Sequence, residues 1–239
     1  MNTLRKIWVT YVLFLHILLA IVLLKSNFIE KVERKLELYK SPELSEYYNE
    51  ITAYHKRIDG AVPRGAAIFI GDSITQSLAT SAVSELSVNY GIGSDTTLGV
   101  LNRLPIYESI NSINSIKAVV IAIGVNDLAR RNNDSIIDNY EDILDYIPKN
   151  TKILVSAILP IDERVQSKKS SNERISKLTS SLKKLTENYE NVVFVDSSNW
   201  LKGDDDNLKT EFHSGDGVHL STAGYEIWIS QLRAPLKGT

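Results

Sequence analysis

The sequence of 239 residues contains no cysteine. This absence excludes disulfide bonds, thiolate metal sites, Cys-x-x-Cys redox chemistry and a cysteine nucleophile. Any covalent catalysis by this chain must therefore use another residue type.

An excess of basic residues is also absent. The formal net charge is −2, and because Arg5, Lys6 and Lys25 lie in the first 25 residues, the remaining chain carries 24 basic and 29 acidic residues. A protein that binds nucleic-acid phosphates is basic over the surface that does so. The composition therefore argues against a nucleic-acid partner.

Long uncharged runs are rare, but one stretch, Ile7–Leu24, holds 18 residues without a formal charge. As a helix it would be about 27 Å long, close to the roughly 30 Å hydrocarbon core of a bilayer. Trp8 and Tyr11 near one end suit the membrane interface. The sequence therefore predicts a single-pass transmembrane helix within residues 1–25. A cleaved signal peptide is the first alternative, although no A-x-A-like site follows, and a buried or interfacial helix is the second.

The side of the membrane is a separate question. Basic residues are more numerous after the apolar run than before it, which by simple counting places the following domain in the cytoplasm. Long domains, however, often cross regardless of flanking charge. We therefore expect an extracytoplasmic catalytic domain.

Residues 26–62 are expected to form a helical linker and a packing helix, and residues 63–239 a single domain. Ser41-Pro42 marks the expected start of the packing helix. His55 lies off its apolar stripe and is expected to be solvated. The stripe, which recurs at three- and four-residue spacing, consists of Leu44, Tyr47, Tyr48, Ile51, Tyr54 and Ile58.

Short apolar runs alternate with helical patterns through the domain. Their near-continuous apolarity is typical of strands buried on both faces, and the alternation indicates a parallel sheet between two layers of helices. We therefore expect a three-layer α/β/α, flavodoxin-like domain with five mostly parallel strands. The expected strands are 66–70, 88–90, 118–123, 152–158 and 191–195, and the expected helices are 96–109, 134–147, 173–189 and 222–232.

Polar and glycine-containing segments follow the first three strands and recur near the end of the chain. In such a sheet, ligands gather where the carboxyl ends of the strands meet the loops. The segments are Gly71-Asp72-Ser73, Gly91-Ile92-Gly93-Ser94-Asp95-Thr96, Gly124-Val125-Asn126-Asp127 and Asp216-Gly217-Val218-His219.

A serine at a helix N-terminus can act as a nucleophile, because backbone N–H groups there can face a developing oxyanion. Ser73 occupies such a position but needs a base. Of the four histidines, only His213 and His219 lie in a suitable region. Asp216 stands three residues before His219, a spacing that lets a carboxylate hold the imidazole, so His219 ranks first and His213 second.

Other interpretations of these segments stay open at this point. Gly-Asp-Ser is ordinary helix-capping sequence, and the segment 216–219 also suits a turn closed by its aspartate side chain. A zinc site of His213, Asp216 and His219 lacks a supporting HExxH helix, and Gly91-Ile92-Gly93 lacks the third glycine of a dinucleotide loop. The G-x-S-x-G elbow of α/β-hydrolases is absent as well.

Taken together and in order, the segments resemble the blocks of the SGNH (GDSL-type) hydrolase family over residues 66–228. The resemblance implies that Ser73 is the nucleophile and that Asp216 and His219 complete the triad. Further agreement lies in Asn89–Thr97, Leu101–Leu104, Ile158-Leu159-Pro160 and Gly224-Tyr225.

The resemblance also implies an oxyanion hole made by the backbone N–H groups of Ser73 and Ser94 and the side-chain amide of Asn126. Ser94 stands where the family has glycine, and it keeps a backbone donor unless the position requires a positive φ. Asp72 and Asp127 are assigned to turns and supporting hydrogen bonds. Asp95 and Thr96 are expected to cap the helix that follows.

The implied activity is hydrolysis of an acyl ester through an acyl-enzyme, without metal or organic cofactor. A small acyl group such as acetyl on a carbohydrate is favoured over a lipid ester, because no long apolar insertion suggests a lid or an acyl tunnel. An acyltransferase that uses the same acyl-enzyme is one alternative. A non-catalytic, membrane-anchored glycan-binding domain is another, and it would predict a damaged triad.

Overall fold

The computed structural model describes residues 3–25, 44–112, 116–166 and 171–237, and the chain divides into two units, Met1–Pro42 and Glu43–Thr239. The first unit contains the helix α1, Thr3–Lys25. Within the described part of the chain, no helix combines the length and the apolar character that crossing a bilayer requires. The expected transmembrane helix is therefore not supported, and the extracytoplasmic location stays a prediction.

The second unit is built on five parallel strands in the order β2-β1-β3-β4-β5, as the alternating pattern predicts. This is the flavodoxin-like order. In chain order the strands are β1 Ala66–Gly71, β2 Ser87–Gly91, β3 Ile116–Ala122, β4 Ile153–Ser156 and β5 Val192–Val195.

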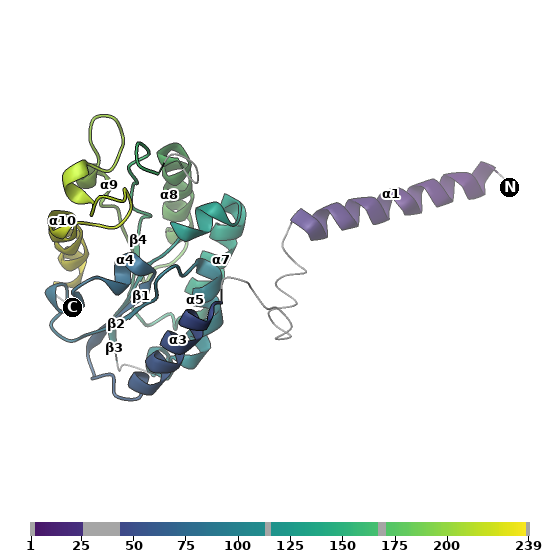
Figure 1. Ribbon diagram of the computed structural model, residues 1–239. Coiled ribbons are helices and arrows are strands. Elements are labelled where there is room, and N and C mark those ends of the chain that lie inside the picture. Colours follow the sequence, from purple (N-terminus) through teal and green to yellow (C-terminus); the bar gives the residue numbers. More distant parts are fainter. Residues whose placement is uncertain (1–2, 26–43, 113–115, 167–170, 238–239) are drawn as a thin grey trace. The chain divides into compact units, whose positions relative to one another are not determined.

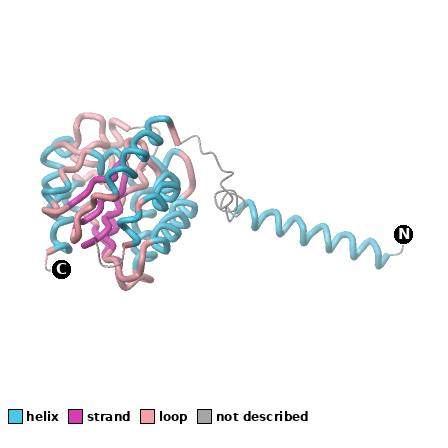
Figure 2. Tube along the Cα trace, turned by 90° about the horizontal axis from the view of Figure 1, so that it is seen from below, coloured by secondary structure: helices cyan, strands magenta, loops and turns pink. Residues whose placement is uncertain are grey.

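Helices cover both faces of this sheet and complete the expected three layers (Figures 1 and 2). In β1, Ile68 and Ile70 belong to the core beneath α5, α7 and α8, whereas Ala67 and Phe69 belong to the core beneath α4, α9 and α10. The longer helices are α3 Glu46–Asp59, α5 Thr97–Arg103, α7 Asn133–Tyr146, α8 Asn172–Thr186 and α10 Thr222–Arg233, and the shorter are α4 Ser73–Gln76, α6 Glu108–Asn111 and α9 Ser198–Leu201.

Short 3₁₀ turns connect several of these elements: Thr80–Ala82 (η1), Leu104–Ile106 (η2), Asn126–Ala129 (η3), Thr210–Phe212 (η4) and Ala234–Leu236 (η5). One of them breaks the helix expected over 96–109. Pro105 lies at the start of η2, and because proline has no N–H to continue the helical ladder, α5 ends at Arg103.

The packing helix α3 buries only part of the expected stripe, with Tyr48 buried and Ile58 packed against the core. The expected start at Pro42 lies outside the described residues, and α3 begins at Glu46, where Ser45 accepts a hydrogen bond from the N–H of Tyr48. Tyr47 and Tyr54 of the stripe are 46% and 50% exposed, while His55 is buried. The expectation of a solvated His55 is therefore wrong.

His55 is buried because the surface that receives α3 is itself polar and aromatic. Its Nδ1 lies 3.1 Å from the hydroxyl of Tyr107, and its ring lies 4.9 Å from that of Tyr90. Asp59, one helical turn on, accepts hydrogen bonds from Tyr90 Oη and from the N–H of Ser109. Burial lowers the pKa of His55 to about 3, so the buried ring is neutral.

Candidate active site

The site lies at the carboxyl ends of β1 and β3, where the strand order reverses and where open α/β sheets bind ligands. Ser73 is the first residue of α4, directly after β1, and Asp72 caps this helix by accepting a 2.9 Å hydrogen bond from the N–H of Ile74. A β-carbon on Gly71 would lie 2.2 Å from the carbonyl oxygen of Ala122. Only glycine therefore lets the strand end so close to its neighbour.

His219 faces Ser73 from a distant part of the chain. Its Nε2 lies 2.8 Å from Ser73 Oγ, and its Nδ1 lies 2.5 Å from Asp216 Oδ2. Asp216 Oδ1 also accepts from the N–H groups of Val218 and His219, which is the predicted aspartate-closed turn. Both interpretations of this segment thus hold, since one carboxylate oxygen closes the turn and the other bonds the imidazole.

These hydrogen bonds set the charge of Asp216. Partial burial alone would raise its pKa, but the donors from His219 and Val218 lower it to about 2. The carboxylate is therefore ionised near neutral pH and can accept a hydrogen bond from the N–H at His219 Nδ1. That arrangement leaves His219 Nε2 to accept the hydroxyl proton of Ser73.

His213, the second candidate, has a different environment. It is buried, and its Nδ1 accepts hydrogen bonds from the N–H groups of Gly215 and Gly217, which flank Asp216. Because Nδ1 is an acceptor, the ring proton lies on Nε2, which is 3.3 Å from Asp162 Oδ2. The ring thus ties the loop to Asp162, and it does not contact Ser73.

Gly217 and Gln166 add to this anchoring of the loop. Gly217 has φ +78°, a conformation that glycine adopts without strain, and its carbonyl oxygen accepts from the N–H of Asp162 at 2.8 Å. Gln166 donates its side-chain amide to the carbonyl oxygen of Asp216 at 2.7 Å. The backbone of Asp216 is therefore held from both sides.

The three expected oxyanion donors come from three elements at one edge of the sheet. Ser73 lies at the start of α4, where first-turn N–H groups have no intrahelical acceptor. Ser94 has φ +63°, so this position does use the left-handed region that favours glycine, and the serine adopts it with its backbone N–H retained. Asn126 donates one side-chain N–H to the carbonyl oxygen of Asp95 at 3.0 Å, and its second N–H stays available for a ligand.

A buried arginine organises the loop that carries Ser94. The guanidinium of Arg103 donates to Asp95 Oδ2, to the carbonyl oxygen of Tyr90 and to that of Gly71. It therefore ties the loop to the ends of β2 and β1. Burial raises the pKa of Asp95 to about 6, although the arginine opposes this shift.

The expected helix caps are only partly correct. Thr96 accepts from the N–H of Gly99 and caps α5, as predicted. Asp95 does not cap that helix, because its carboxylate is engaged by the N–H of Thr96 and by Arg103. An ion pair with a buried arginine, rather than the helix end, therefore determines its position.

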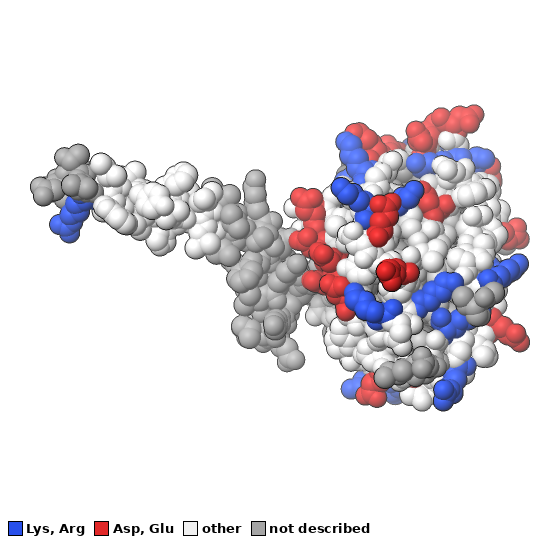
Figure 3. Space-filling view, turned by 180° about the vertical axis from the view of Figure 1, so that it is seen from behind, with Lys and Arg blue, Asp and Glu red and all other residues white. Residues whose placement is uncertain are grey.

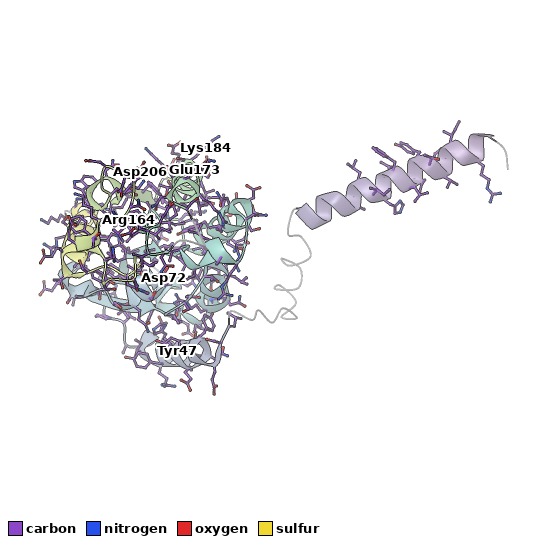
Figure 4. The ribbon with its side chains drawn as sticks, turned by 45° about the horizontal axis from the view of Figure 1, so that its top comes forward. Tyr47, Asp72, Arg164, Glu173, Lys184 and Asp206 are labelled. Atoms are coloured by element: carbon purple, nitrogen blue, oxygen red, sulfur yellow. The ribbon has the colours of Figure 1, made fainter. Side chains whose placement is uncertain are left out.

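The remaining motif aspartates are buried supports. Asp127 accepts from the N–H and hydroxyl of Thr97 and pairs with Arg131, and burial raises its pKa. Burial also raises the pKa of Asp72 to about 7, against the lowering effect of the Ile74 N–H. Figure 4 shows Asp72 well inside the outline of the domain. Neither carboxylate contacts Ser73 Oγ or His219, so the geometry places both as supports.

A cleft of about 540 Å³ opens beside His219 and Asn126. Six of its ten lining residues are polar, and the other four are Val125, Ala129, Ile161 and Val218. Its lining residues are Ser94, Val125, Asn126, Ala129, Arg130, Ile161, Gln166, Asp216, Val218 and His219. The cleft has room for a group larger than acetyl next to the serine.

The sequence patterns did not indicate Asp162, Gln166 or the roles of Arg103 and His213. A signal existed for Asp162, because it follows β4 at the same carboxyl edge of the sheet as the segments after β1, β2 and β3. No spacing rule connects His213 to Asp162, since 51 residues separate them. Their pairing depends on how the last loop folds back over the sheet.

Comparisons with known proteins identify the family and the fold. The model of the GDSL-like lipase/acylhydrolase family matches residues 69–227. No curated protein matches the sequence.

Several solved structures share the fold. A Streptococcus pneumonia protein, provisionally described as a platelet activating factor, is 25% identical with TM-score 0.72, over 88% of this chain and 99% of that one. A GDSL-like lipase from Bacteroides thetaiotaomicron is 20% identical with TM-score 0.68, over 80% and 98%. A carbohydrate esterase family 3 protein from Talaromyces cellulolyticus is 17% identical with TM-score 0.56, over 72% and 96%.

The family match covers most of the chain and includes the strand ends that carry Ser73 and Asn126. It confirms the resemblance drawn from the ordered sequence blocks. The chain belongs to the GDSL-like lipase/acylhydrolase family and is a hydrolase that acts on ester bonds.

Proposed function

We propose that the protein hydrolyses acyl esters through an acyl-enzyme on Ser73, with His219 and Asp216 as the other members of the triad. The observation that carries the proposal is the continuous hydrogen-bonded row from Ser73 Oγ to His219 Nε2 and from His219 Nδ1 to Asp216 Oδ2. This order of groups is the one that serine hydrolases require.

In the first half-reaction, Ser73 Oγ attacks the ester carbonyl carbon while His219 Nε2 takes the hydroxyl proton. The carbon–oxygen bond to the alcohol then breaks, and the alcohol leaves with the proton from His219. In the second, water attacks the acyl-enzyme, gives its proton to His219 and releases the carboxylic acid. Asp216, ionised throughout, stabilises the transient imidazolium.

The negative charge on the carbonyl oxygen forms between three donors in this proposal. They are the N–H groups of Ser73 and Ser94 and the free side-chain N–H of Asn126. Removal of one such donor lowers kcat by about 10² to 10³ in serine hydrolases. We expect that loss of kcat for Asn126→Ala, because the variant lacks the side-chain N–H proposed to face the oxyanion. The carbonyl oxygen of Asp95 also loses its donor in this variant.

We propose a small acyl group, such as acetyl, on a larger alcohol. Six of the ten residues that line the cleft are polar, which supports this choice, because a long acyl chain requires apolar walls. The structural neighbours do not choose between substrate classes, since they include a lipase and a carbohydrate esterase. A series of p-nitrophenyl esters from acetate to palmitate tests the acyl length, and faster turnover of the long chains would contradict the proposal.

The decisive experiment measures p-nitrophenyl acetate hydrolysis by the full chain and by Ser73→Ala. We expect kcat to fall by about 10⁴ or more, because the nucleophile is removed. The matched control is Ser176→Ala, which changes an exposed serine on α8. Equal turnover by all three proteins would remove the proposed function.

A further inference from the structure

One cation in the cleft, Arg130, has no partner among the residues that the structure describes. Arg130 lines the same cleft as Asn126 and His219 and is exposed. Among the residues that the structure describes, none forms a hydrogen bond or an ion pair with its guanidinium. We propose that Arg130 binds an anionic group, a carboxylate or a phosphate, on the alcohol portion of the ester. This inference rests on the proposed function.

The position of Arg130 is determined by the oxyanion segment. It follows η3, the 3₁₀ turn that begins at Asn126, and its N–H donates to the carbonyl oxygen of Asp127 at 2.8 Å. Asp127 is in turn held by Thr97 and Arg131. The backbone of Arg130 is therefore fixed close to the amide that faces the reacting carbonyl.

Two neighbouring arginines, Arg131 and Arg174, have structural roles. Arg131 is largely buried and pairs with Asp127. Arg174 donates to Asn133 and to the carbonyl oxygens of Leu128 and Arg131. Both guanidinium groups are used within the protein, whereas Arg130 lines the cleft and has no acceptor in the described part of the chain.

No carboxylate among the described lining residues of the cleft is bonded to Arg130. Asp216 is the acidic residue among its described lining residues, and its carboxylate is already engaged by His219 and two backbone N–H groups. The chain after residue 25 is net acidic, with 24 basic and 29 acidic residues. Figure 3 shows both signs intermixed over one face of the domain. An anion is therefore attracted by the local charge and not by a general positive field.

The chemistry of the guanidinium defines the ligand class. Arginine stays charged at all working pH values, and its planar group donates two parallel hydrogen bonds to a carboxylate or a phosphate. If the acyl group is small, the anion has to lie on the alcohol portion. The substrate class is then the acyl ester of an acidic sugar or of another alcohol that carries a carboxylate or phosphate.

Matched esters test this directly with the full chain. The carboxylate pair is 4-acetoxybenzoate and methyl 4-acetoxybenzoate, and the phosphate pair is 4-acetoxyphenyl phosphate and 4-methoxyphenyl acetate. For each pair we measure kcat/KM of the anionic ester divided by that of the neutral one. In Arg130→Gln we expect this ratio to fall about tenfold, mainly through KM of the anionic ester, and to fall less in Arg130→Lys.

Arg64→Gln is the control, because Arg64 is an exposed arginine that precedes β1, at the opposite edge of the sheet from the site. A ratio that is unchanged in Arg130→Gln, or that falls equally in Arg64→Gln, overturns the inference about Arg130 and leaves the proposed function standing. The pair with the larger fall identifies carboxylate or phosphate as the preferred group. Turnover that is equal in the wild type and Ser73→Ala removes the proposed function, and this inference with it.

Discussion

Two histidines of the last loop, His213 and His219, each pair with an aspartate, and the two pairs differ in sequence separation, burial and distance. His219 and Asp216 are three residues apart, 43% exposed at both side chains, and joined at 2.5 Å. His213 and Asp162 are 51 residues apart, buried, and joined at 3.3 Å. The same two residue types therefore serve different purposes in one loop.

The difference lies in the second ring nitrogen. In His219 that nitrogen faces the hydroxyl of Ser73, so the ring can exchange a proton with a reacting group. In His213 it accepts from Gly215 and Gly217, so the ring is fully used in holding the backbone. His219 has a ring nitrogen available to the reacting hydroxyl, as a proposed base requires. His213 has no such nitrogen, as expected for a positioning residue.

The largest effect on activity is predicted for breaking the exposed pair, His219 and Asp216. His219→Ala should lower kcat for p-nitrophenyl acetate by about 10⁴ or more, because Ser73 loses its base. The melting temperature should change by less than about 3 °C, since the side chain is partly exposed and its loss leaves the carboxylate of Asp216 with two backbone donors and solvent. A variant that melts much earlier would show that the loop depends on this ring.

Breaking the buried pair should give the reverse pattern. His213→Phe keeps the ring volume but leaves the N–H groups of Gly215 and Gly217 without their acceptor, which costs about 1–3 kcal/mol. For a domain of this size we expect the melting temperature to fall by about 3–10 °C. Activity should fall only about tenfold, because Asp216 keeps its contacts with Gln166 and His219.

His213→Asn distinguishes anchoring of the loop from proton transfer. Its side-chain oxygen can accept one of the two N–H groups, so we expect part of the stability and of kcat to return. The shape of the pH–rate profile should match that of the wild type. A profile that loses a titration in both His213 variants would contradict the positioning role.

The two pairs also show how far sequence reasoning reaches. Ser73, Asn126 and the Asp216–His219 turn each follow a strand or lie within one short segment, and parallel strands bring their carboxyl ends together. Fold class therefore predicted that Ser73 and Asn126 lie at one edge of the sheet, and local spacing paired Asp216 with His219. The resemblance to the SGNH family implied that all four form one site. The buried pair needed the fold-back of the last loop over β4, which no periodicity encodes.

Helix α3 shows a second limit of the same kind. Its apolar spacing predicted which face packs, but His55 and Asp59 are buried because Tyr90, Tyr107 and Ser109 provide polar partners there. An amphipathic pattern predicts a buried face correctly only when the receiving surface is apolar. The identity of that surface comes from residues more than 30 positions away.

Stability should depend on pH in opposite ways through the buried carboxylate of Asp72 and the partly exposed one of Asp216. Burial raises the pKa of Asp72 to about 7, whereas an aspartate in the unfolded chain titrates near 4. Between these values the unfolded chain releases a proton that the folded protein keeps, so this group makes stability fall as pH rises from about 4 to 7. Asp216, with a pKa of about 2, acts in the opposite direction and only below about pH 4.

Asp72→Asn tests this by denaturant unfolding at pH 5 and pH 8. Asparagine keeps an oxygen that can accept from the N–H of Ile74 but cannot ionise. We expect the variant to lose less stability than the wild type between the two pH values. Asp204→Asn, on an exposed loop, is the control and should follow the wild type. Parallel losses in all three proteins would show that Asp72 is ionised when folded at both pH values.

The smallest effect on activity is expected at Ser94, where the proposed mechanism requires only the backbone N–H. Ser94→Gly keeps the N–H that faces the proposed oxyanion and removes the cost of a left-handed residue, about 1 kcal/mol, at φ +63°. Greater freedom of glycine in the unfolded chain offsets this by about 0.4–1 kcal/mol. We therefore expect kcat/KM within about threefold of the wild type and a melting temperature within about 2 °C, whereas Asn126→Ala loses about 10² to 10³ in kcat. A large loss in Ser94→Gly would instead show that the serine hydroxyl contacts the substrate, because that hydroxyl is the group that the substitution removes.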